Sequence, residues 1–356
     1  MDKKRIGVLF GGKSSEHEVS RVSAKSIIDN IPRDKYDVVM VGITKKGEWR
    51  YYDGSTEKLP TGEWETDPSV CTAIISPDPT QRGLIVFRDG RVETVTLDAV
   101  FPALHGRNGE DGSVQGLLQL AGLPCVGCDI ASSAICMDKA LTNTICEQYG
   151  IRQAKWMQIN NYEYSVNGDE LCEKAVQKLG FPIFVKPANA GSSVGISKAA
   201  DLDGLKNAID LAFKYDSKLV LEEGIDAREI ECAVLGNEEP IASALGEIIP
   251  ANDFYDYDAK YVSDSGLIIP AELPENIQTE IRETAIRAYR AWGCSGLARV
   301  DFFVRKSDGC VLLNEPNTIP GFTSISMYPK LFEASGIPYS ELLDRLITLA
   351  MERTGA

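Results

Sequence analysis

Two apolar runs near the end of the chain carry three side chains that could bind a divalent cation. Asp301 lies in the run "ARVDFF", and Glu315 and Asn317 lie two positions apart in "LLNEPN". The intervening "KSDG" (306–309) is typical of a hairpin turn, so the two runs are expected to pair as strands. Because strand side chains alternate between faces, Glu315 and Asn317 share one face, where Asp301 can join them. Two carboxylates and an amide suit Mg²⁺, although the spacing is equally compatible with an ordinary solvated face.

A second stretch has the composition of a phosphate-binding loop. "KPANAGSSVGISK" (186–198) follows the apolar run "FPIFV" and contains two glycines, three serines and two lysines. It is not a Walker P-loop, because Gly195 is followed by Ile196 where that motif requires lysine. Taken in isolation, the stretch is most simply interpreted as a plain surface loop.

The composition excludes several classes of protein. The 356 residues are enough for two or three domains, and 44% apolar with 25% charged residues is ordinary for a globular protein. A formal net charge of −15 without a basic run argues against nucleic-acid binding, because the chain would repel a phosphate backbone. Small anionic ligands remain compatible, since a local cluster of cations can hold them.

The N-terminal segment and the cysteines point to a cytoplasmic protein. The apolar part of the segment, 6–10, is far shorter than a signal sequence or a membrane span, so no membrane association is expected. Nine cysteines and two histidines fit reduced thiols better than a disulfide framework. Cys125 and Cys128 form the only C-x-x-C pair, so buried free thiols are favoured over a redox pair, and no zinc site is expected.

Alternating apolar runs and helical patterns predict an α/β fold. The run "IGVLF" (6–10) is expected to form a strand, followed by a Gly-Gly turn and a helix that starts near Ser14 or Ser15. The next strand, "DVVMVGI" (37–43), completes a βαβ unit, and a second unit has its helix from about Val114. The fingerprint G-x-G-x-x-G is absent from the first turn, so a dinucleotide site is not indicated.

The middle of the chain predicts a compact unit of the size that binds a nucleotide. The strand "FPIFVKP" (181–187) leads into the glycine and serine loop, and the amphipathic helix "LDGLKNAIDLAF" (202–213) follows. The next strand, "SKLVLEEGI" (217–225), ends in two carboxylates. Beyond it the pattern favours strands until a long helix over "PENIQTEIRETAIRAYRAWG" (274–293).

Several segments, taken together, resemble one enzyme family. The chain resembles the D-alanine–D-alanine ligases of the ATP-grasp superfamily, a group that includes the D-alanine–D-serine ligases of vancomycin resistance. The segments follow the family order over nearly the whole chain, so a chance match to all of them is not credible. They are "GGKSSEHEVS" (11–20), "ALHGRNGEDGSVQG" (103–116), "MDK" (137–139), "FVKPANAGSSVGISK" (184–198), "FYDYDAKYVSD" (254–264), "GCSGLARVDFF" (293–303) and "NEPNTIPGFTSISMYP" (314–329).

The resemblance implies an α/β (α+β) ATP-grasp fold with three domains. Residues 1–127 would form an N-terminal Rossmann-like α/β domain, and 128–225 a central ATP-grasp domain. Residues 226–356 would form a C-terminal ATP-grasp domain that carries the lid loop and the metal ligands. The loop from Ala188 to Gly195 would be the glycine-rich flap that covers the triphosphate through its backbone N–H groups.

The resemblance also implies the reaction. The carboxylate of a first D-alanine would attack the γ-phosphate of ATP to give D-alanyl phosphate, and the amine of a second D-alanine would displace the phosphate. Such phosphoryl transfer depends mostly on positioning and on neutralising charge. Two Mg²⁺ ions, for which Mn²⁺ could substitute, are implied at Asp301, Glu315 and Asn317, and a homodimer is the family expectation.

The family pattern assigns one group of residues to ATP. Lys139 and Lys186 would contact the phosphates, as would the loop serines, and Lys260 the phosphoryl group in transfer. The adenine would be held by Glu222 and by backbone close to it, and the ribose hydroxyls by a further glutamate. The full ATP-binding set is Lys139, Lys186, Ser192, Ser193, Glu222, Glu223, Ile225, Glu229 and Lys260.

A second group is assigned to the amino-acid substrates. Glu16 would pair with the ammonium group of the first D-alanine, because a helix N-terminus alone repels cations, and His105 would lie beside it. Ser192 would link Glu16 to Tyr261 on the lid, which would close over the site and exclude water. Lys260, the neighbour of Tyr261, is also implied in substrate binding.

The transition state and the second substrate are assigned to the C-terminal part. Arg299 and the backbone N–H of Gly321 are implied as an oxyanion hole, and Ser326 as the partner of the second D-alanine's carboxylate. Met327 stands where D-serine-using relatives carry arginine, and its apolar thioether suits a methyl side chain. The lid segment "FYDYDAKY" (254–261) contains no histidine, in contrast to D-lactate-using relatives, so D-lactate is disfavoured.

The expected function is therefore ATP-dependent synthesis of D-alanyl-D-alanine for peptidoglycan. A D-alanine–D-serine ligase is the close alternative, and another ATP-grasp carboxylate–amine ligase is a more distant one. A nonenzymatic ATP-binding regulatory protein belongs to a different class, and it would be expected to have lost Arg299 or the metal ligands. Small molecules, without nucleic acid or membrane, are the expected partners.

Overall fold

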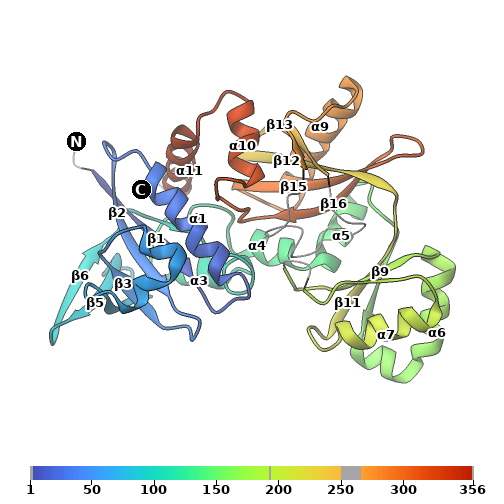
Figure 1. The fold of residues 1–356 in the computed structure, drawn as a ribbon, viewed down its shortest axis with the longest axis horizontal. Helices are drawn as coiled ribbons and strands as arrows, with labels where there is room; N and C mark the ends of the chain where they lie inside the picture. Colours follow the sequence, from blue (N-terminus) through green and yellow to red (C-terminus); the bar gives the residue numbers. More distant parts are fainter. Residues whose placement is uncertain (1–2, 192–193, 250–265, 355–356) are drawn as a thin grey trace.

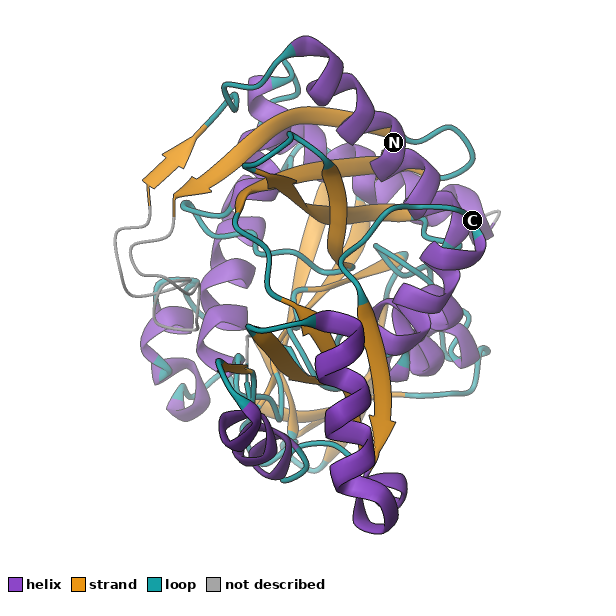
Figure 2. Cartoon of the chain, turned by 90° about the vertical axis from the view of Figure 1, so that its right-hand side faces the viewer, coloured by secondary structure: helices purple, strands orange, loops and turns teal. Residues whose placement is uncertain are grey.

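In the part of the chain that the structure describes, the strands form three separate sheets. The structure is a computed structural model that describes residues 3–191, 194–249 and 266–354, and Figure 1 shows their arrangement. Four predicted site residues, Ser192, Ser193, Lys260 and Tyr261, lie outside these ranges. Figure 2 shows helices packed around the strands, so the architecture is the mixed α/β type that the sequence predicts.

The first sheet has the strand order β6-β5-β4-β3-β2-β1-β7. β1 pairs in parallel with β2 and with β7, which confirms the predicted βαβ opening. The four strands after β2 extend the sheet in antiparallel fashion, an extension that the sequence did not reveal. The strands are β1 (Lys4–Gly11), β2 (Tyr36–Ile43), β3 (Trp49–Tyr52), β4 (Cys71–Ile75), β5 (Gly83–Arg88), β6 (Arg91–Thr96) and β7 (Ala99–Pro102), and the helices are α1 (His17–Asn30), α2 (Lys58–Thr61), the 3₁₀ helix η1 (Glu63–Thr66) and α3 (Ser113–Leu120).

The first helix begins later than the sequence indicated. The prediction of a start near Ser14 or Ser15 was wrong, because α1 begins at His17 with Glu16 as its N-cap residue. The hydroxyl of Ser14 accepts a hydrogen bond from the backbone N–H of Glu16 at 3.1 Å, so the two serines belong to a turn before the helix. This turn places Glu16 at the carboxyl end of the parallel strands.

The second sheet, with the order β10-β9-β11-β8, is entirely antiparallel. Its strands β9 and β11 and the helix α7 confirm the elements predicted for the middle of the chain. Two short helices, α4 and α5, precede it. The elements are α4 (Ile130–Met137), α5 (Lys139–Gln148), β8 (Trp156–Asn160), α6 (Asn161–Leu179), β9 (Ile183–Pro187), β10 (Ser197–Ala199), α7 (Leu202–Ala212) and β11 (Lys218–Glu223).

The third sheet, with the order β14-β13-β12-β15-β16, contains the predicted hairpin. β15 and β16 are antiparallel, with Asp301 opposite Glu315 and Arg299 opposite Asn317. The long helix predicted over 274–293 is also present as α9. The elements are β12 (Ala227–Gly236), β13 (Ile241–Ile249), β14 (Gly266–Ile268), α9 (Glu275–Ala291), β15 (Gly296–Arg305), β16 (Val311–Asn317), α10 (Met327–Ala334) and α11 (Tyr339–Thr354).

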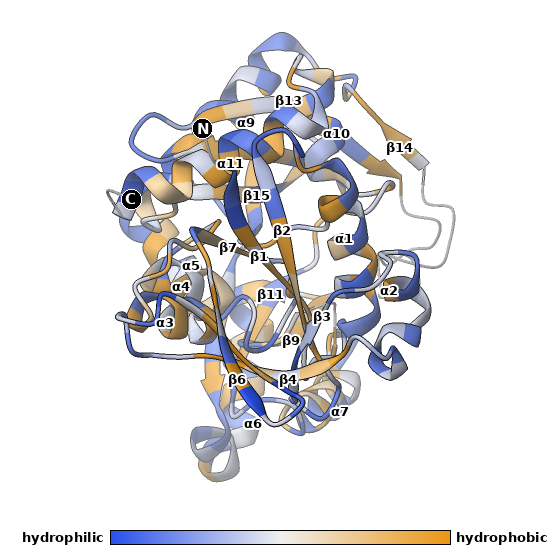
Figure 3. Cartoon of the chain, turned by 90° about the vertical axis from the view of Figure 1, so that its left-hand side faces the viewer, coloured by the Kyte–Doolittle hydropathy of each residue, from blue (hydrophilic) through white to orange (hydrophobic). Residues whose placement is uncertain are grey.

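One hydrophobic cluster joins the first sheet to the end of the chain. Buried side chains of β1, β7 and α1 pack with those of α10 and α11, and Figure 1 shows α11 beside α1. Phe101 on β7 meets Phe322 edge to face, with ring centroids 5.7 Å apart. Figure 3 shows the apolar colour along β1 and β7, where this cluster lies. The two ends of the chain therefore stabilise each other.

No helix in the described ranges is both long and apolar enough to cross a membrane. The cysteines in the described ranges are free thiols, as predicted, and six of the nine are buried.

The shared cluster makes a prediction about stability. Leu346 of α11 has no exposed surface and lies in this cluster, whereas Leu120 at the end of α3 is 66% exposed. We expect Leu346→Ala to lower the free energy of unfolding by about 2–5 kcal/mol, because it leaves a cavity between the two ends of the chain. The matched control Leu120→Ala should change it by about 0.5 kcal/mol or less. Urea unfolding followed by circular dichroism measures both, and equal midpoints for the two variants would contradict the shared core.

Candidate active site

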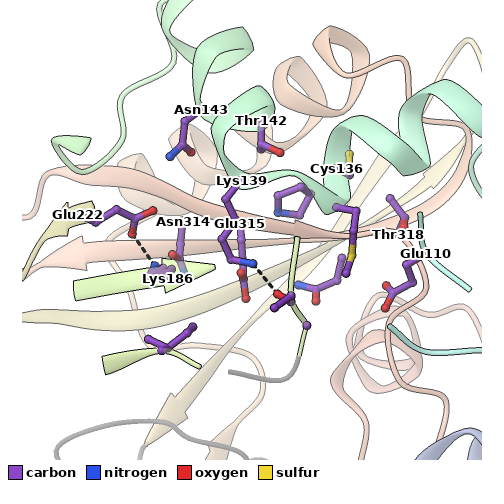
Figure 4. Close-up of a pocket in the computed structure, with 16 residues that line it drawn as sticks. Glu110, Cys136, Lys139, Thr142, Asn143, Lys186, Glu222, Asn314, Glu315 and Thr318 are labelled. Carbon is purple, nitrogen blue, oxygen red and sulfur yellow. Dashed lines mark hydrogen bonds and ion pairs between the residues drawn. The ribbon is translucent and has the colours of Figure 1, made fainter. Parts of the chain in front are cut away.

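A pocket lies where the second and third sheets approach each other (Figure 4). It brings together five residues that the sequence predicted: Lys139, Lys186, Glu222, Glu315 and Asn317. These residues come from α5, β9, β11 and β16, which are far apart in the sequence. Glu110, Asn143, Asn314 and Thr318 also line it, although the sequence analysis assigned none of them a role.

The side chain of Lys186 on β9 is only 13% exposed, and its cation is paired across the sheet. Its Nζ lies 2.5 Å from Oε2 of Glu222, which is on the neighbouring strand β11. Burial alone lowers the pKa of Lys186, but the negative charges of Glu222 and Glu315 outweigh it and raise the pKa above its usual value. Lys186 therefore keeps its positive charge inside the pocket.

Lys139 is positioned by its neighbour Asp138. The carboxylate of Asp138 caps α5 by accepting hydrogen bonds from the backbone N–H groups of Ala140 and Leu141, and it also pairs with Lys218 on β11. Lys139 itself donates from its backbone N–H to Ala188 O at 3.0 Å and from Nζ to Ala190 O at 2.8 Å. The helix start and the loop after β9 thus hold this second cation at the pocket wall.

The sheet that supplies Glu315 and Asn317 to the pocket carries the predicted Arg299 and Asp301 on the neighbouring strand β15, although neither of these two lines the pocket itself. Arg299 donates to both oxygens of Asp301 at 2.7 Å and lies 3.0 Å from Glu231 on β12. Burial disfavours the guanidinium cation, but Asp301 and Glu231 more than offset this and raise the pKa of Arg299 well above its usual value. A guanidinium group that is held by two carboxylates has little freedom to rotate, so the orientation of Arg299 is fixed before any ligand binds.

The oxygen donors on this face fit the ligands that Mg²⁺ prefers. Asn317 donates through Nδ2 to Asp301 at 2.9 Å, which leaves its Oδ1 as an acceptor for a cation. Among the described residues, no group of three or more His, Cys, Asp or Glu side chains could hold a metal ion. A site here would therefore use the two carboxylates Asp301 and Glu315, the Asn317 amide and oxygens of the nucleotide, which is the usual arrangement for Mg²⁺.

The predicted Glu16 and His105 lie on the side of the first sheet. Glu16 is 6% exposed, and its Oε2 would lie 2.5 Å from a Cβ atom at Gly106, whose positive φ of 68° favours glycine at that position. Its carboxylate also approaches Gly191 of the loop after β9. Glu16 is thus directed toward the junction of the first and second sheets.

The protonation state of His105 follows from its partners. Its Nδ1 is 3.0 Å from Ile319 O, which can only accept, so Nδ1 carries the proton and Nε2 accepts from the Ser23 hydroxyl at 3.0 Å. Burial lowers the pKa of His105, although the charge of Glu16 acts in the opposite direction. His105 is therefore a neutral link between α1 and the segment after β16.

Glu110 is a site residue that the sequence analysis missed. One of its oxygens accepts from Gly106 N at 2.7 Å and the other from Ile319 N at 3.1 Å, so it joins two loops that border the pocket. Burial, together with the charge of Glu16, raises the pKa of Glu110 to about 8. Its place in "GRNGEDG" was quoted as a family segment, but nothing in the spacing showed that its carboxylate faces inward.

The remaining predicted residues lie at different distances from the pocket. Gly321 and Ser326 are adjacent, since a Cβ atom at Gly321 would lie 2.6 Å from Ser326 Oγ. Met327 is only 6% exposed and belongs to the core cluster of the first sheet, and it is not among the residues that line the pocket. Glu223 bonds to Lys155, while Glu229 lies on β12 and exerts its charge on Lys186. Ile225, in the segment between β11 and β12, is partly exposed.

Comparison with known proteins identifies the family. A family profile described as D-ala D-ala ligase N-terminus matches residues 5–128, and one described as D-ala D-ala ligase C-terminus matches 145–348. The chain belongs to the D-alanine–D-alanine ligase family. A protein named D-alanine–D-alanine ligase from Thermoanaerobacter sp. strain X514 is 54% identical, over 99% of this chain and 98% of its own. One of the same name from Caldicellulosiruptor bescii is 52% identical, over 99% of this chain and 96% of its own.

Solved structures of the ligase family share the fold. The VanG D-Ala:D-Ser ligase from Enterococcus faecalis superposes with a TM-score of 0.89 at 40% identity, covering 98% of this chain and 100% of that one. The D-alanine–D-alanine ligase from Coxiella burnetii gives 0.86 at 38% identity, with coverage of 99% and 96%. The three-sheet architecture is therefore the ATP-grasp fold of these ligases, as the sequence predicted.

The raised pKa of Glu110 makes stability depend on pH. The folded chain holds the Glu110 proton up to about pH 8, whereas an unfolded glutamate releases it near its ordinary pKa of about 4.3. Because the folded state then binds more protons than the unfolded state, stability should fall as pH rises through this window and level off above it.

Glu110→Gln cannot titrate and removes this contribution. We expect the melting temperature of the wild type to fall more steeply than that of Glu110→Gln between about pH 5 and about pH 8. At the acidic end of this range the variant should have a lower melting temperature than the wild type, because its amide leaves one backbone N–H without an acceptor. If the melting temperatures of the two proteins changed equally with pH over this range, Glu110 would be ionised in the folded protein and the prediction would be wrong.

Proposed function

We propose that this protein is an ATP-dependent ligase that joins two D-alanine molecules through a D-alanyl phosphate intermediate. The observation that carries the proposal is the pocket itself, in which the cations of Lys139 and Lys186 face the oxygen donors Glu315 and Asn317. Cations on one wall and metal-binding oxygens on the other can neutralise a triphosphate from both sides. The full-length similarity to proteins of that name supports the same reaction.

ATP binding requires the pocket to widen. Its volume is about 70 Å³, whereas pockets for ligands of ordinary size have volumes of about 300 to 1,000 Å³. Ala190 and Gly191, which belong to the loop after β9, form part of its wall. We infer that this loop moves outward when the nucleotide enters, and that the loop and Lys139, which is bonded to Ala190, move together.

The adenosine part of ATP is proposed to lie at the end of β11. Glu222 would accept from the adenine amino group, with backbone near Glu223 and Ile225 completing the edge contacts, and Glu229 would accept from the ribose hydroxyls. Glu222 and Glu229 both exert charge on Lys186, so the nucleoside and the phosphates would be held by one connected set of charges.

Mg²⁺ is proposed at Asp301, Glu315 and Asn317, as two ions for which Mn²⁺ could substitute. When bound, the metal would neutralise charge on the phosphate oxygens. Arg299 now donates to both oxygens of Asp301, so its cation would have to share this carboxylate with the metal. Glu231 also pairs with Arg299, so it can balance more of the guanidinium charge when the metal binds Asp301.

The amino-acid substrates are proposed to lie where the carboxyl edge of the first sheet meets the loop after β9 and the segment after β16. Glu16 would hold the ammonium group of the first D-alanine, next to His105. Arg299 and the N–H of Gly321 would stabilise the oxyanion, and Ser326, adjacent to Gly321, would hold the carboxylate of the second D-alanine. Ser192, Ser193, Lys260 and Tyr261 keep the roles that the family implies.

D-alanine is proposed as the second substrate, with D-serine as the alternative. The relatives that are about half identical to this chain are named D-alanine–D-alanine ligase, whereas the solved D-Ala:D-Ser ligase is 40% identical. An apolar pocket discriminates against one extra hydroxyl by only about a hundredfold, so slow use of D-serine is compatible with this assignment. A homodimeric cytoplasmic enzyme with the domains 1–127, 128–225 and 226–356 completes the proposal.

The proposal is tested by product analysis. The purified protein with ATP and Mg²⁺ should release phosphate on addition of D-alanine alone, and mass spectrometry should show D-alanyl-D-alanine. Added D-serine should change the product little. A product dominated by D-alanyl-D-serine would show that D-serine is the second substrate. No turnover with either amino acid would favour a regulatory ATP-binding protein.

A substitution tests the acidic wall. Glu315→Gln keeps the size of the side chain but removes one of two carboxylates proposed to hold metal, so we expect phosphate release to fall by about a hundredfold or more. The matched control is Glu283→Gln on α9, which neutralises an exposed carboxylate away from the pocket and should retain full activity. Wild-type phosphate release by a correctly folded Glu315→Gln variant would exclude the metal role.

A further inference from the structure

A second cavity lies at the carboxyl edge of the first sheet. It has a volume of about 250 Å³ and is lined by residues that end or follow β1, β2 and β7, and by one side of α3. β1 lies between β2 and β7. The chain first places β2 on one side of β1 and later returns to place β7 on the other side, so the strand order reverses at β1. Crevices at such reversal points of parallel sheets are common ligand sites. Among the described residues that were given roles above for ATP or the substrates, His105 alone lines this cavity, and its two ring nitrogens already bond to Ser23 and Ile319.

The walls of the cavity are mostly apolar. Ile43 and Leu104 come from the ends of β2 and β7, and Val114 and Leu117 come from α3. Trp49, at the start of β3, is partly exposed and forms a further wall. An apolar surface of this kind favours a ligand with an aromatic or branched body over a fully polar one.

Two cations border this apolar surface without partners. Lys13 and Arg107 are exposed and line the cavity, and within the described part of the chain neither forms an ion pair or a side-chain hydrogen bond. Neighbouring Lys45, by contrast, pairs with Glu18. Asp111 lies nearby in sequence, but its carboxylate accepts from the backbone N–H groups of Asn108 and Ser113.

The charge at this cavity is opposite to that of the whole chain. The chain carries a net charge of −15, yet no carboxylate side chain of the described residues lines the cavity, while Lys13 and Arg107 do. Two cations that face an apolar space attract an anion whose other end is apolar. We propose that this cavity is a second ligand site, which binds a small organic carboxylate with an apolar body.

The loop between Leu104 and Glu110 borders both this site and the candidate active site. Arg107 lines the second cavity, whereas Glu110, three residues later, lines the pocket of Figure 4. Ser14 also lines the second cavity, and its hydroxyl accepts from the backbone N–H of Glu16. A bound carboxylate would therefore act on the turn and the loop that position Glu16, and so on the affinity for the first D-alanine; this consequence rests on the proposed function, whereas binding itself does not.

Binding can be measured with 4-iodobenzoate as the probe. Its ring fits the apolar wall, its carboxylate can reach the two cations, and iodine quenches a tryptophan that it contacts. Titration should give saturable quenching of tryptophan fluorescence, and Trp49→Phe should abolish the quenching. The neutral analogue 4-iodobenzamide should bind about fivefold to tenfold more weakly, because it lacks the charge that the cations attract.

Variants separate this site from adventitious binding. The double variant Lys13→Gln/Arg107→Gln should weaken 4-iodobenzoate by about fivefold to tenfold, since two exposed ion pairs are lost. The matched control Lys178→Gln/Lys214→Gln makes the same change in net charge at two exposed lysines away from the cavity and should bind as the wild type does. Leu117→Trp should block the cavity by occupying its apolar space. Equal affinities for the benzoate and the benzamide, or equal weakening by both double variants, would overturn the proposal.

A crystal soaked in 4-iodobenzoate locates the probe through the anomalous signal of iodine. We expect the iodine beside Trp49 and Leu117; a signal only elsewhere would refute the site. This experiment needs no turnover, so a protein that binds the probe here but makes no dipeptide would disprove the proposed function and leave the second site intact. A protein that makes the dipeptide but does not bind the probe here would support the proposed function and disprove the second site.

Discussion

The ammonium group of Lys186, whose side chain is only 13% exposed, constrains how the second and third sheets can be placed. A buried charge costs several kcal/mol unless it is paired, so the fold must bring carboxylates to it. Glu222 does so from the adjacent strand β11, at 2.5 Å, and this pair could form within the second sheet alone. The charge of Glu315, which also raises the pKa of Lys186, comes from β16 in the third sheet. A cation in one sheet and a carboxylate in another therefore favour the same arrangement that creates the pocket.

The junction with the first sheet is held by hydrogen bonds that cross between distant segments. His105 bonds to Ser23 of α1 and to Ile319 O, and Glu110 bonds to Gly106 and Ile319 N. Ile319 is thus held through both its carbonyl and its N–H by the loop after β7. Because the same loop also lies against Glu16, a displacement of the segment after β16 would change the environment of that carboxylate. The residues proposed for the first substrate consequently depend on contacts from the opposite end of the chain.

The sequence predicted much of the fold because its signals are local. The hairpin of β15 and β16, the parallel strands β1 and β2 and the helix α9 each follow from a periodic pattern within their own segment. The antiparallel strands β3 to β6 were missed because they are short, and β6 is almost entirely exposed, so no buried face marks it. In the site, the family resemblance supplied Lys139 and Lys186, which the pocket brings together. Glu231 could not be found in this way, since its role depends on standing opposite Asp301 on a strand separated from it by about 70 residues.

Met327 shows why a residue's place in the packing matters for arguments about specificity. The sequence suggested that its apolar side chain suits D-alanine, in contrast to the arginine of D-serine-using relatives. In the structure Met327 belongs to a hydrophobic core, and a Cβ atom at Gly246 would lie 2.2 Å from its Cε. Gly246 on β13 stands opposite Glu231 on β12, so the carboxylate on that face of the sheet is Glu231, which already pairs with Arg299. An arginine at position 327 would therefore bring a second cation to a carboxylate that Arg299 holds, so the effect of this position on the second substrate depends on the packing around Gly246 and on Glu231 as well as on the side chain itself.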